Sequence, residues 1–237
     1  LPKAPTPMTA ALTKLSYSVA PAATVYFYTN EEWRGIEKRA REYDAKLDGL
    51  YKEYEERTTQ AEKERQRQKS FRDRAADAVT GGSASRKESV KLMTKEDFER
   101  MHRDEIPGEM RSCNEVVQMA KKMAEKNGIN IYSLLGKKKE IAQSGNSTEQ
   151  YMDDLEEYVG SRGAYTPIVK FTEIQLNNPA LEGIEVIDTP GLNDPVQSRS
   201  RETEKSLMQC DAVFLLSYCG QFLGAEDIEF ISHTLPY

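Results

Sequence analysis

The chain has 237 residues, a formal net charge of −6, 30% charged residues and 38% hydrophobic residues. A chain of this length can bury a sizeable core, but the low apolar fraction predicts that part of it forms a solvated helical region. The acidic balance argues against nucleic acid as a partner, because phosphate binding needs a clustered basic face. The longest apolar run, Ala212–Tyr218, is too short to span a bilayer, so any membrane contact is expected to be peripheral.

The cysteines and the first residues of the chain indicate the cellular compartment of the protein. Cys113, Cys210 and Cys219 are odd in number and have no metal-binding spacing, which indicates reduced thiols in a cytosolic protein. The chain begins at Leu1 without a charged-then-apolar leader, so no signal peptide is expected.

The first 30 residues predict two adjacent strands. The runs "ALTKLSYS" and "ATVYFYTN" are rich in β-branched and aromatic residues and are separated by a short segment containing Pro21. Thr29 and Glu32 then have the spacing of a capping box, which predicts that a helix begins here. Apolar residues follow at spacings of three and four and predict one buried seam, made of Trp33, Ile36, Ala40, Tyr43, Leu47, Leu50 and Tyr54.

The helix continues beyond this seam as a polar segment. Residues Arg57–Arg74 contain seven basic and three acidic side chains. We interpret them as a solvated helix face, with a surface for lipid headgroups or an acidic partner as the alternative. Thr80–Ser89, "TGGSASRKES", has the composition of a flexible linker.

Shorter elements fill the rest of the chain. Helices are expected after Thr94, over Glu109–Lys126, and from Ser147 to just before Gly160. Pro167–Leu176 predicts a strand, Ile184–Asp188 a short buried strand, and Ala212–Tyr218 a fully buried strand. Helices are also expected over Ser198–Gln209 and Ala225–His233. The fold class is therefore α/β, a mixed sheet flanked by helices with a long helical insertion, in three parts: 1–30, 31–165 and 166–237.

The segment "VIDTPGLNDP" carries the first chemical signal. An aspartate at the end of a strand, here Asp188, can hold Mg²⁺ through water, and the N–H of a glycine three residues later, Gly191, can face a γ-phosphate. Thr189 and Pro190 bend the chain between them. Taken alone, this pattern is also common where a strand simply ends in a loop. Thr9, in a proline-rich loop before the first strand, has the position of a switch threonine on Mg²⁺ and the attacking water.

Together these segments resemble the dynamin family of large GTPases, most closely its bacterial members. The resemblance lies in Leu1–Thr9, the strand that follows, Lys170–Asp194 and Cys210–Ser217, and it leaves the middle of the chain unexplained. It implies GTP and Mg²⁺ as ligands, with Thr9 and Asp188 at the metal, Thr9 and Gly191 acting in catalysis, and Asp188, Thr189, Pro190 and Gly191 at the nucleotide. Leu192 replaces the water-positioning glutamine of Ras-like enzymes, as in dynamin-like enzymes generally.

Two motifs of such enzymes are missing from these residues. No G-x-x-x-x-G-K-[ST] occurs, and neither "TGGSASRKES" nor "LLGKKKE" has its spacing. The family's P-loop is expected upstream of Leu1 and its guanine-reading motif beyond Tyr237. "TKED" at Thr94–Asp97 matches the guanine motif literally, but we interpret it as a helix N-cap. The 237 residues alone are therefore expected to be inactive.

The resemblance further implies a cytoplasmic, peripherally membrane-associated protein. It implies a homodimer formed through the GTPase domain, and lipid binding and remodelling through regions outside these residues. Two alternatives remain open. One is a non-hydrolysing helical scaffold on a degenerate GTPase fold, and the other is a soluble regulatory GTPase with no membrane role.

Overall fold

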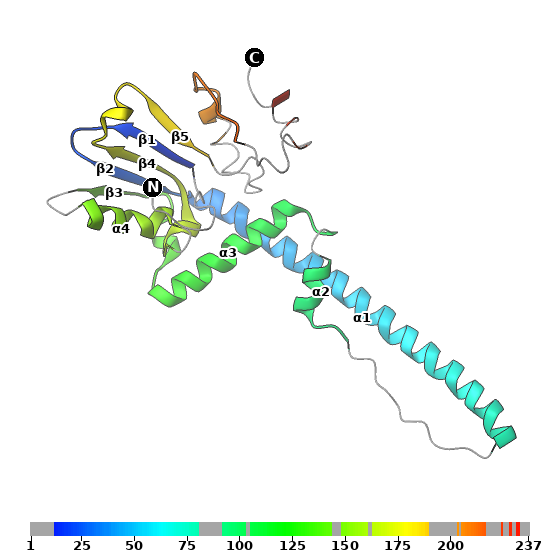
Figure 1. The fold of residues 1–237 in the computed structure, drawn as a ribbon. Coiled ribbons are helices and arrows are strands. Elements are labelled where there is room, and N and C mark those ends of the chain that lie inside the picture. The colour runs from blue at the N-terminus through cyan, green and yellow to red at the C-terminus, as the bar shows by residue number, and fades with distance from the viewer. Residues whose placement is uncertain are drawn as a thin grey trace. The chain divides into compact units, whose positions relative to one another are not determined.

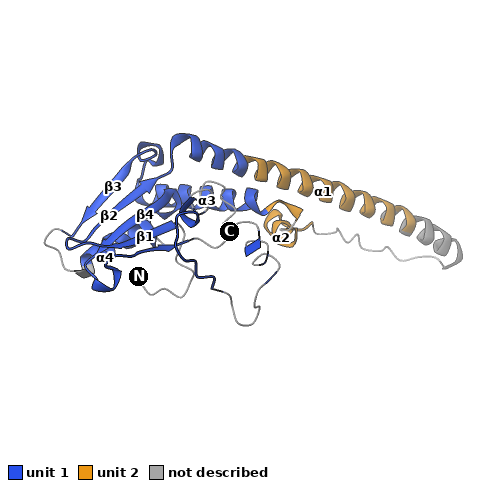
Figure 2. Ribbon diagram, turned by 90° about the horizontal axis from the view of Figure 1, so that it is seen from above, with its two compact units in different colours: residues 1–40, 108–237 blue, residues 41–107 orange. Residues whose placement is uncertain are grey.

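The computed structural model describes residues 12–80, 92–102, 105–143, 148–160, 163–189, 203, 205–216, 224, 228 and 231–232. Its contacts divide the chain into two compact units (Figure 2). Unit 1 comprises residues 1–40 and 108–237, and unit 2 comprises residues 41–107.

Unit 1 is built on a mixed five-stranded sheet with the strand order β3-β2-β4-β1-β5 (Figure 1). The strands are β1 (Leu12–Tyr17), β2 (Ala22–Phe27), β3 (Lys138–Ala142), β4 (Val169–Leu176) and β5 (Glu185–Asp188). β1 runs parallel to β4 and antiparallel to β5, while β2 is antiparallel to both β3 and β4. The α/β class and the mixed sheet predicted from the sequence are confirmed.

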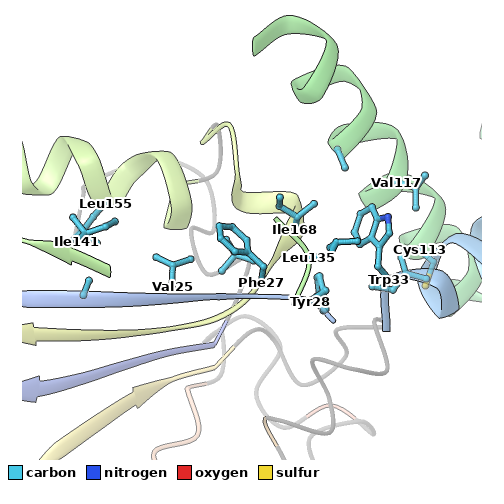
Figure 3. Close-up of a cluster of buried hydrophobic side chains, with 14 of the residues drawn as sticks. Val25, Phe27, Tyr28, Trp33, Cys113, Val117, Leu135, Ile141, Leu155 and Ile168 are labelled. Atoms are coloured by element: carbon cyan, nitrogen blue, oxygen red, sulfur yellow. The ribbon is translucent and has the colours of Figure 1, made fainter. Parts of the chain in front are cut away.

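One face of the sheet is covered by helix α4 (Thr148–Val159). Alternating side chains of β2, among them Val25 and Phe27, point to this face and are buried, as is Ile141 of β3. Tyr151 and Leu155 of α4 close over them. Figure 3 shows Leu155 beside Ile141, with Val25 and Phe27 continuing the same layer.

The same core extends to the start of helix α1 (Asn30–Thr80) and to helix α3 (Gly108–Asn127). Trp33 of α1 packs in one cluster with Cys113 and Val117 of α3 (Figure 3). Tyr132, just after α3, donates a hydrogen bond to Glu37 at 2.6 Å. Among the described connections are short 3-10 helices at Ile131–Ser133, Thr166–Ile168 and Pro179–Leu181.

The predicted capping box at the start of α1 is confirmed. The Glu32 N–H donates to Thr29 Oγ1 at 3.2 Å, and the Thr29 N–H donates back to Glu32 Oε2 at 2.9 Å. Each contact satisfies an N–H group that a helix start otherwise leaves without a partner. The predicted seam is also confirmed, because its first five residues are buried and its last two, Leu50 and Tyr54, are half-buried.

Unit 2 contains the middle and far parts of α1 together with helix α2 (Lys95–Met101). Thr94 caps α2 by accepting from the Asp97 N–H at 3.2 Å, so the "TKED" sequence is an N-cap, as predicted. The backbone of Met93 is held by two tyrosines of α1: Tyr51 donates to its carbonyl at 2.7 Å, and its N–H donates to Tyr54 at 3.2 Å.

Several sequence predictions differ from the structure. The segment 31–165 was expected to be helical, but it contains β3, and α3 and α4 belong to the same compact unit as the sheet. The sequence pattern did not predict strand β3, because its sequence, "KKEIA", is charged and has one buried residue, Ile141. The division into 1–30, 31–165 and 166–237 stays a prediction, and the compact units divide at other residues.

The apolar segments near the end of the chain were expected to be buried strands. β5 does form, but Ile184 beside it is 54% exposed and Val186 within it is 41% exposed. Residues 212–216 are not a strand, and Phe214 and Leu216 are 89% and 93% exposed. The burial predicted for both segments is therefore wrong for these residues in this structure. The expected helices at Ser198–Gln209 and Ala225–His233 lie largely outside the described residues.

The core contains a polar group whose removal should not weaken the fold. The Tyr151 hydroxyl is buried without a hydrogen-bond partner, and burial raises its pKa to about 12. Because an unpaired buried hydroxyl costs about 1–3 kcal/mol, Tyr151→Phe is expected to leave the free energy of unfolding unchanged or to raise it by up to that amount. Urea unfolding measures it.

Tyr43→Phe is the matched control, because the Tyr43 hydroxyl donates to Glu99 at 2.6 Å. Loss of this hydrogen bond should lower the free energy of unfolding by about 1–2 kcal/mol. If Tyr151→Phe were as destabilising as Tyr43→Phe, the Tyr151 hydroxyl would have a partner in solution.

Candidate functional site

Asp188 is the last residue of β5, and the strand pairing fixes where it lies in the sheet. β5 pairs with β1 so that Asp188 is opposite Thr13, and β1 pairs with β4 so that Leu12 is opposite Phe171. Because β5 is antiparallel to β1, the end of β5 and the beginnings of β1 and β4 share one edge of the sheet. Asp188 is half-buried at this edge.

The other predicted site residues are attached to the same edge through the chain. Thr189 follows Asp188 directly and is half-buried. Thr9, Pro190 and Gly191 lie outside the described residues. Thr9 precedes Leu12, the first residue of β1, by three positions, and Gly191 follows Asp188 by three. The segment that carries Thr9 therefore enters the sheet at the edge where the segment that carries Gly191 leaves it.

The described residues at this edge could hold Mg²⁺ only through water molecules. Asp188 supplies a carboxylate, the hard oxygen donor that Mg²⁺ prefers. Within the residues that the structure describes, no three His, Cys, Asp or Glu side chains gather to hold a metal ion. A site with fewer than three such ligands is consistent with contact through the metal's water shell, which Mg²⁺ gives up reluctantly.

An ion pair that the sequence did not reveal lies at the start of β4. Lys170 Nζ is 3.0 Å from Glu32 Oε1, and only 16% of the Lys170 side chain is exposed. The pairing of β2 with β4 shifts by one residue between Tyr26 and Phe27, and Lys170 is the residue left over. A lysine in an alternating strand usually indicates the solvent face, so no sequence signal could have placed it against the capping box.

The ion pair and the capping box act on the same carboxylate. Burial favours the neutral form of Glu32, but hydrogen bonds from the Thr29 backbone, Lys170 and the Thr29 hydroxyl outweigh it and lower the pKa of Glu32 below its ordinary 4.5. A group whose pKa is lowered on folding stabilises the folded state above its unfolded pKa, and this stability is lost as the pH falls through its folded pKa. Glu32 thus fastens the first turn of α1 to β4.

The effect of Glu32 on stability should depend on pH. At pH 7, Glu32→Gln is expected to lower the free energy of unfolding by about 1–2 kcal/mol, because the amide replaces a charged acceptor of three hydrogen bonds. The difference from the native chain should shrink as the pH falls from about 4.5 through the lower folded pKa of Glu32, because the carboxyl of the folded native chain then becomes neutral too. Urea unfolding between pH 7 and pH 3 measures this difference in the free energy of unfolding.

Glu31→Gln is the control, because Glu31 is the neighbouring acidic residue of the same helical turn and is exposed. It should cost only a few tenths of a kcal/mol. An effect of Glu32→Gln that is constant across this pH range would contradict the role assigned to its charge.

Comparison with known proteins identifies the family. A family model described as "Dynamin family" matches residues 1–236. The chain belongs to the dynamin family. Proteins of this family are GTP hydrolases that bind GTP, generally with Mg²⁺. The resemblance read from Leu1–Thr9 and "VIDTPGLNDP" is thereby confirmed.

Two solved structures of bacterial dynamins are similar to this dynamin-family chain. Their titles describe an oligomerised bacterial dynamin pair that provides a mechanism for the long-range sensing and tethering of membranes. The first is 17% identical over 98% of this chain, with a TM-score of 0.49, and the second is 18% identical over 95%, with a TM-score of 0.45. The matches span 21% and 24% of those longer chains. No curated protein matches.

A search of the described helices for a membrane span was negative. None of them combines the length and the apolar character that crossing a bilayer requires.

Proposed function

We propose that the whole protein hydrolyses GTP at the sheet edge where β5 ends. The observation that carries the proposal is the strand register, in which Asp188 is opposite Thr13 at the beginning of β1. This register supports a site in which the segments carrying Thr9 and Gly191 meet at one edge. These are the two segments that respond to a γ-phosphate in GTPases.

Each residue has a separate task in this proposal. Asp188 accepts hydrogen bonds from the water shell of Mg²⁺ and fixes its position. Thr9 contributes its hydroxyl to the metal and its carbonyl to the attacking water, while the Gly191 N–H donates to a γ-phosphate oxygen. Mg²⁺, when bound, neutralises the charge that develops on the phosphate oxygens. The P-loop and the guanine-reading motif come from parts of the protein outside these 237 residues.

The exposed apolar segments support a sheet that continues in the whole protein. β5 pairs with β1 on one side, and no described strand pairs with it on the other. An unpaired edge that exposes Val186, next to Ile184, is a template for a further strand. Phe214 and Leu216, which are almost fully exposed here, likewise need a partner surface. A P-loop strand and its neighbours would cover both.

A direct test compares GTP binding by the 237-residue chain and by the whole protein. The chain alone is expected to show no saturable binding at micromolar concentrations. Micromolar affinity needs about −8 kcal/mol, and net hydrogen bonds of about 1–3 kcal/mol each, from one glycine N–H and one hydrated metal, cannot supply it. Titration of a fluorescent GTP analogue with Mg²⁺ measures both proteins.

The whole protein should bind in the same titration, and it should release phosphate from GTP. Absence of both in the whole protein would contradict the proposed function and favour the non-hydrolysing scaffold. The 51 residues of α1, which the proposed chemistry does not use, are the feature that a scaffold would explain. Low-micromolar binding by the chain alone would instead mean that it contains a phosphate site of its own.

The proposal also covers partners and location. The whole protein is cytoplasmic, dimerises through its GTPase domain and associates peripherally with membranes through regions outside these residues. The match of the whole chain to the dynamin family supports this. Co-sedimentation of the whole protein with liposomes tests the membrane role, and a soluble regulatory GTPase would stay in the supernatant.

A further inference from the structure

A row of side chains crosses four strands of the sheet at the candidate site. Asp188 of β5 is opposite Thr13 of β1, which is opposite Thr172 of β4. Thr172 is in turn opposite Val25 of β2. Residues directly opposite each other in neighbouring strands project to the same face of a sheet. The face that carries Val25, under helix α4, therefore carries three polar residues in succession toward its β5 edge.

The two threonines of this row are buried in an otherwise apolar layer. Both Thr13 and Thr172 are among the buried polar residues. The next row on the same face is apolar, with Leu15, Ile174 and Ala23 opposite one another. A buried hydroxyl costs free energy unless it forms a hydrogen bond. A valine has the same shape, so a buried threonine that contributes to function should do so through its hydroxyl.

The surroundings of the Thr13 hydroxyl leave one direction for this contribution. Thr172 Oγ1 is buried without a hydrogen-bond partner, so the Thr13 hydroxyl is not bonded to it. On its other side Thr13 faces Asp188. Side chains directly opposite each other in an antiparallel pair have Cβ atoms about 4.5–5.5 Å apart, which brings a hydroxyl and a carboxylate within hydrogen-bond reach.

We propose that Thr13 is a positioning residue for Asp188. Its hydroxyl donates a hydrogen bond to one carboxylate oxygen and leaves the other for the water shell of Mg²⁺. Carboxylates at metal sites are commonly oriented by such a bond, and its loss typically costs about 10–100-fold in metal affinity or activity. The inference rests on the proposed function, because it needs Asp188 at the metal.

Strand β1 is suited to this task. It is the described neighbour of β5, and no described strand pairs with β5 on the other side. The branched side chain of a threonine in a strand has restricted χ1 rotation, so its hydroxyl is held in place. Thr13 also follows Thr9 by four residues. One strand would then anchor both the threonine proposed to bind the metal and the group that orients Asp188.

The experiment compares Thr13→Val with Thr13→Ser in the whole protein, by two measurements. Phosphate release at saturating GTP gives kcat. The Mg²⁺ concentration that half-saturates binding of a fluorescent, non-hydrolysable GTP analogue gives the metal requirement without turnover. Thr13→Val is expected to lower kcat about tenfold, which corresponds to about 1.4 kcal/mol, the size of one hydrogen bond. It should also raise the half-saturating Mg²⁺ concentration about fivefold.

Thr13→Ser keeps the hydroxyl, so both values should stay within about threefold of the native protein. Thr172→Val is the matched control, because it makes the same change one strand further from Asp188 and removes a hydroxyl without a partner. Both measurements should stay within about twofold of the native values. If circular dichroism shows that Thr13→Val does not fold, Thr13→Ala takes its place with the same expected losses.

A double-variant comparison tests whether Thr13 acts through Asp188. Asp188→Ala removes the carboxylate and should lower kcat at least about 100-fold. Adding Thr13→Val to it should lower kcat by no more than about twofold further, because the group that Thr13 orients is already absent. A further loss of about tenfold would overturn the proposal, since the two residues would then act independently.

Two other results would overturn the proposal and leave the proposed function standing. One is an equal loss in Thr13→Val and Thr13→Ser, which would assign the effect to packing. The other is a native kcat and Mg²⁺ requirement in Thr13→Val although Asp188→Ala loses both. Failure of the proposed function is distinguishable, because the native whole protein would then release no phosphate from GTP. If Asp188→Ala also left the Mg²⁺ requirement of analogue binding unchanged, Thr13 would have no metal-holding group to position.

Discussion

Asp188→Asn in the whole protein is expected to lower kcat for GTP hydrolysis about 100-fold, which corresponds to roughly 2.7 kcal/mol of lost transition-state stabilisation. The asparagine amide has nearly the same shape as the carboxylate but no charge. It orders the water around Mg²⁺ less firmly, so the charge that develops on the phosphate oxygens is less well neutralised. Steady-state phosphate release, with saturating GTP, measures kcat.

Glu185→Gln is the matched control. Glu185 begins the same strand, is exposed and is opposite Ser16, away from the edge where Asp188 lies. Its replacement removes one negative charge from β5 without touching the proposed site, so kcat should stay within about twofold. If Asp188→Asn also left kcat unchanged, Asp188 would have no part in hydrolysis, whatever the family of the chain.

The features that the sequence predicted correctly are local ones. The capping box of Thr29 and Glu32 and the N-cap at Thr94 each involve residues three positions apart, and a helix start alone determines their geometry. The seam from Trp33 to Leu47 is similarly a property of one helix, since its apolar spacing decides which side faces the core. Such patterns can be read without knowing the rest of the fold.

The failures concern partners that a local pattern cannot reveal. The apolar runs at Ile184–Asp188 and Ala212–Tyr218 indicate that these segments need burial, but not which strand provides it. In the structure Val186 and Phe214 are exposed. Lys170 is the opposite case, a charged residue held against Glu32 by a shift in strand pairing. Both cases depend on segments distant in sequence.

The candidate site shows the same division. The sequence indicated Asp188 from its place between a strand and a turn, and the strand pairing then supplied what the sequence lacked, its position opposite Thr13 at the beginning of β1. Roles for Thr9 and Gly191 depend on their place along the chain relative to this edge. The ion pair of Lys170 with Glu32 at the start of β4 came from the structure alone.

The other large effect is expected in unit 2, where Leu47→Asp should lower the free energy of unfolding by about 3–5 kcal/mol. Leu47 lies in the seam of α1 and is 4% exposed. The new carboxylate would therefore be desolvated without a hydrogen bond or a countercharge to compensate. Part of the loss comes from the apolar contacts, and Leu47→Ala, which removes only these, should cost about 2–3 kcal/mol.

Lys46→Asp tests whether burial is the cause of this loss. Lys46 precedes Leu47 on the same turn and is exposed, so an aspartate there stays hydrated and should change the free energy of unfolding by about 0.5 kcal/mol or less. Urea unfolding followed by circular dichroism measures all three variants. If Leu47→Asp had the helicity and the urea midpoint of the native chain, the burial of the seam would be contradicted. A loss in Lys46→Asp as large as in Leu47→Asp would show that added charge, and not burial, weakens the helix.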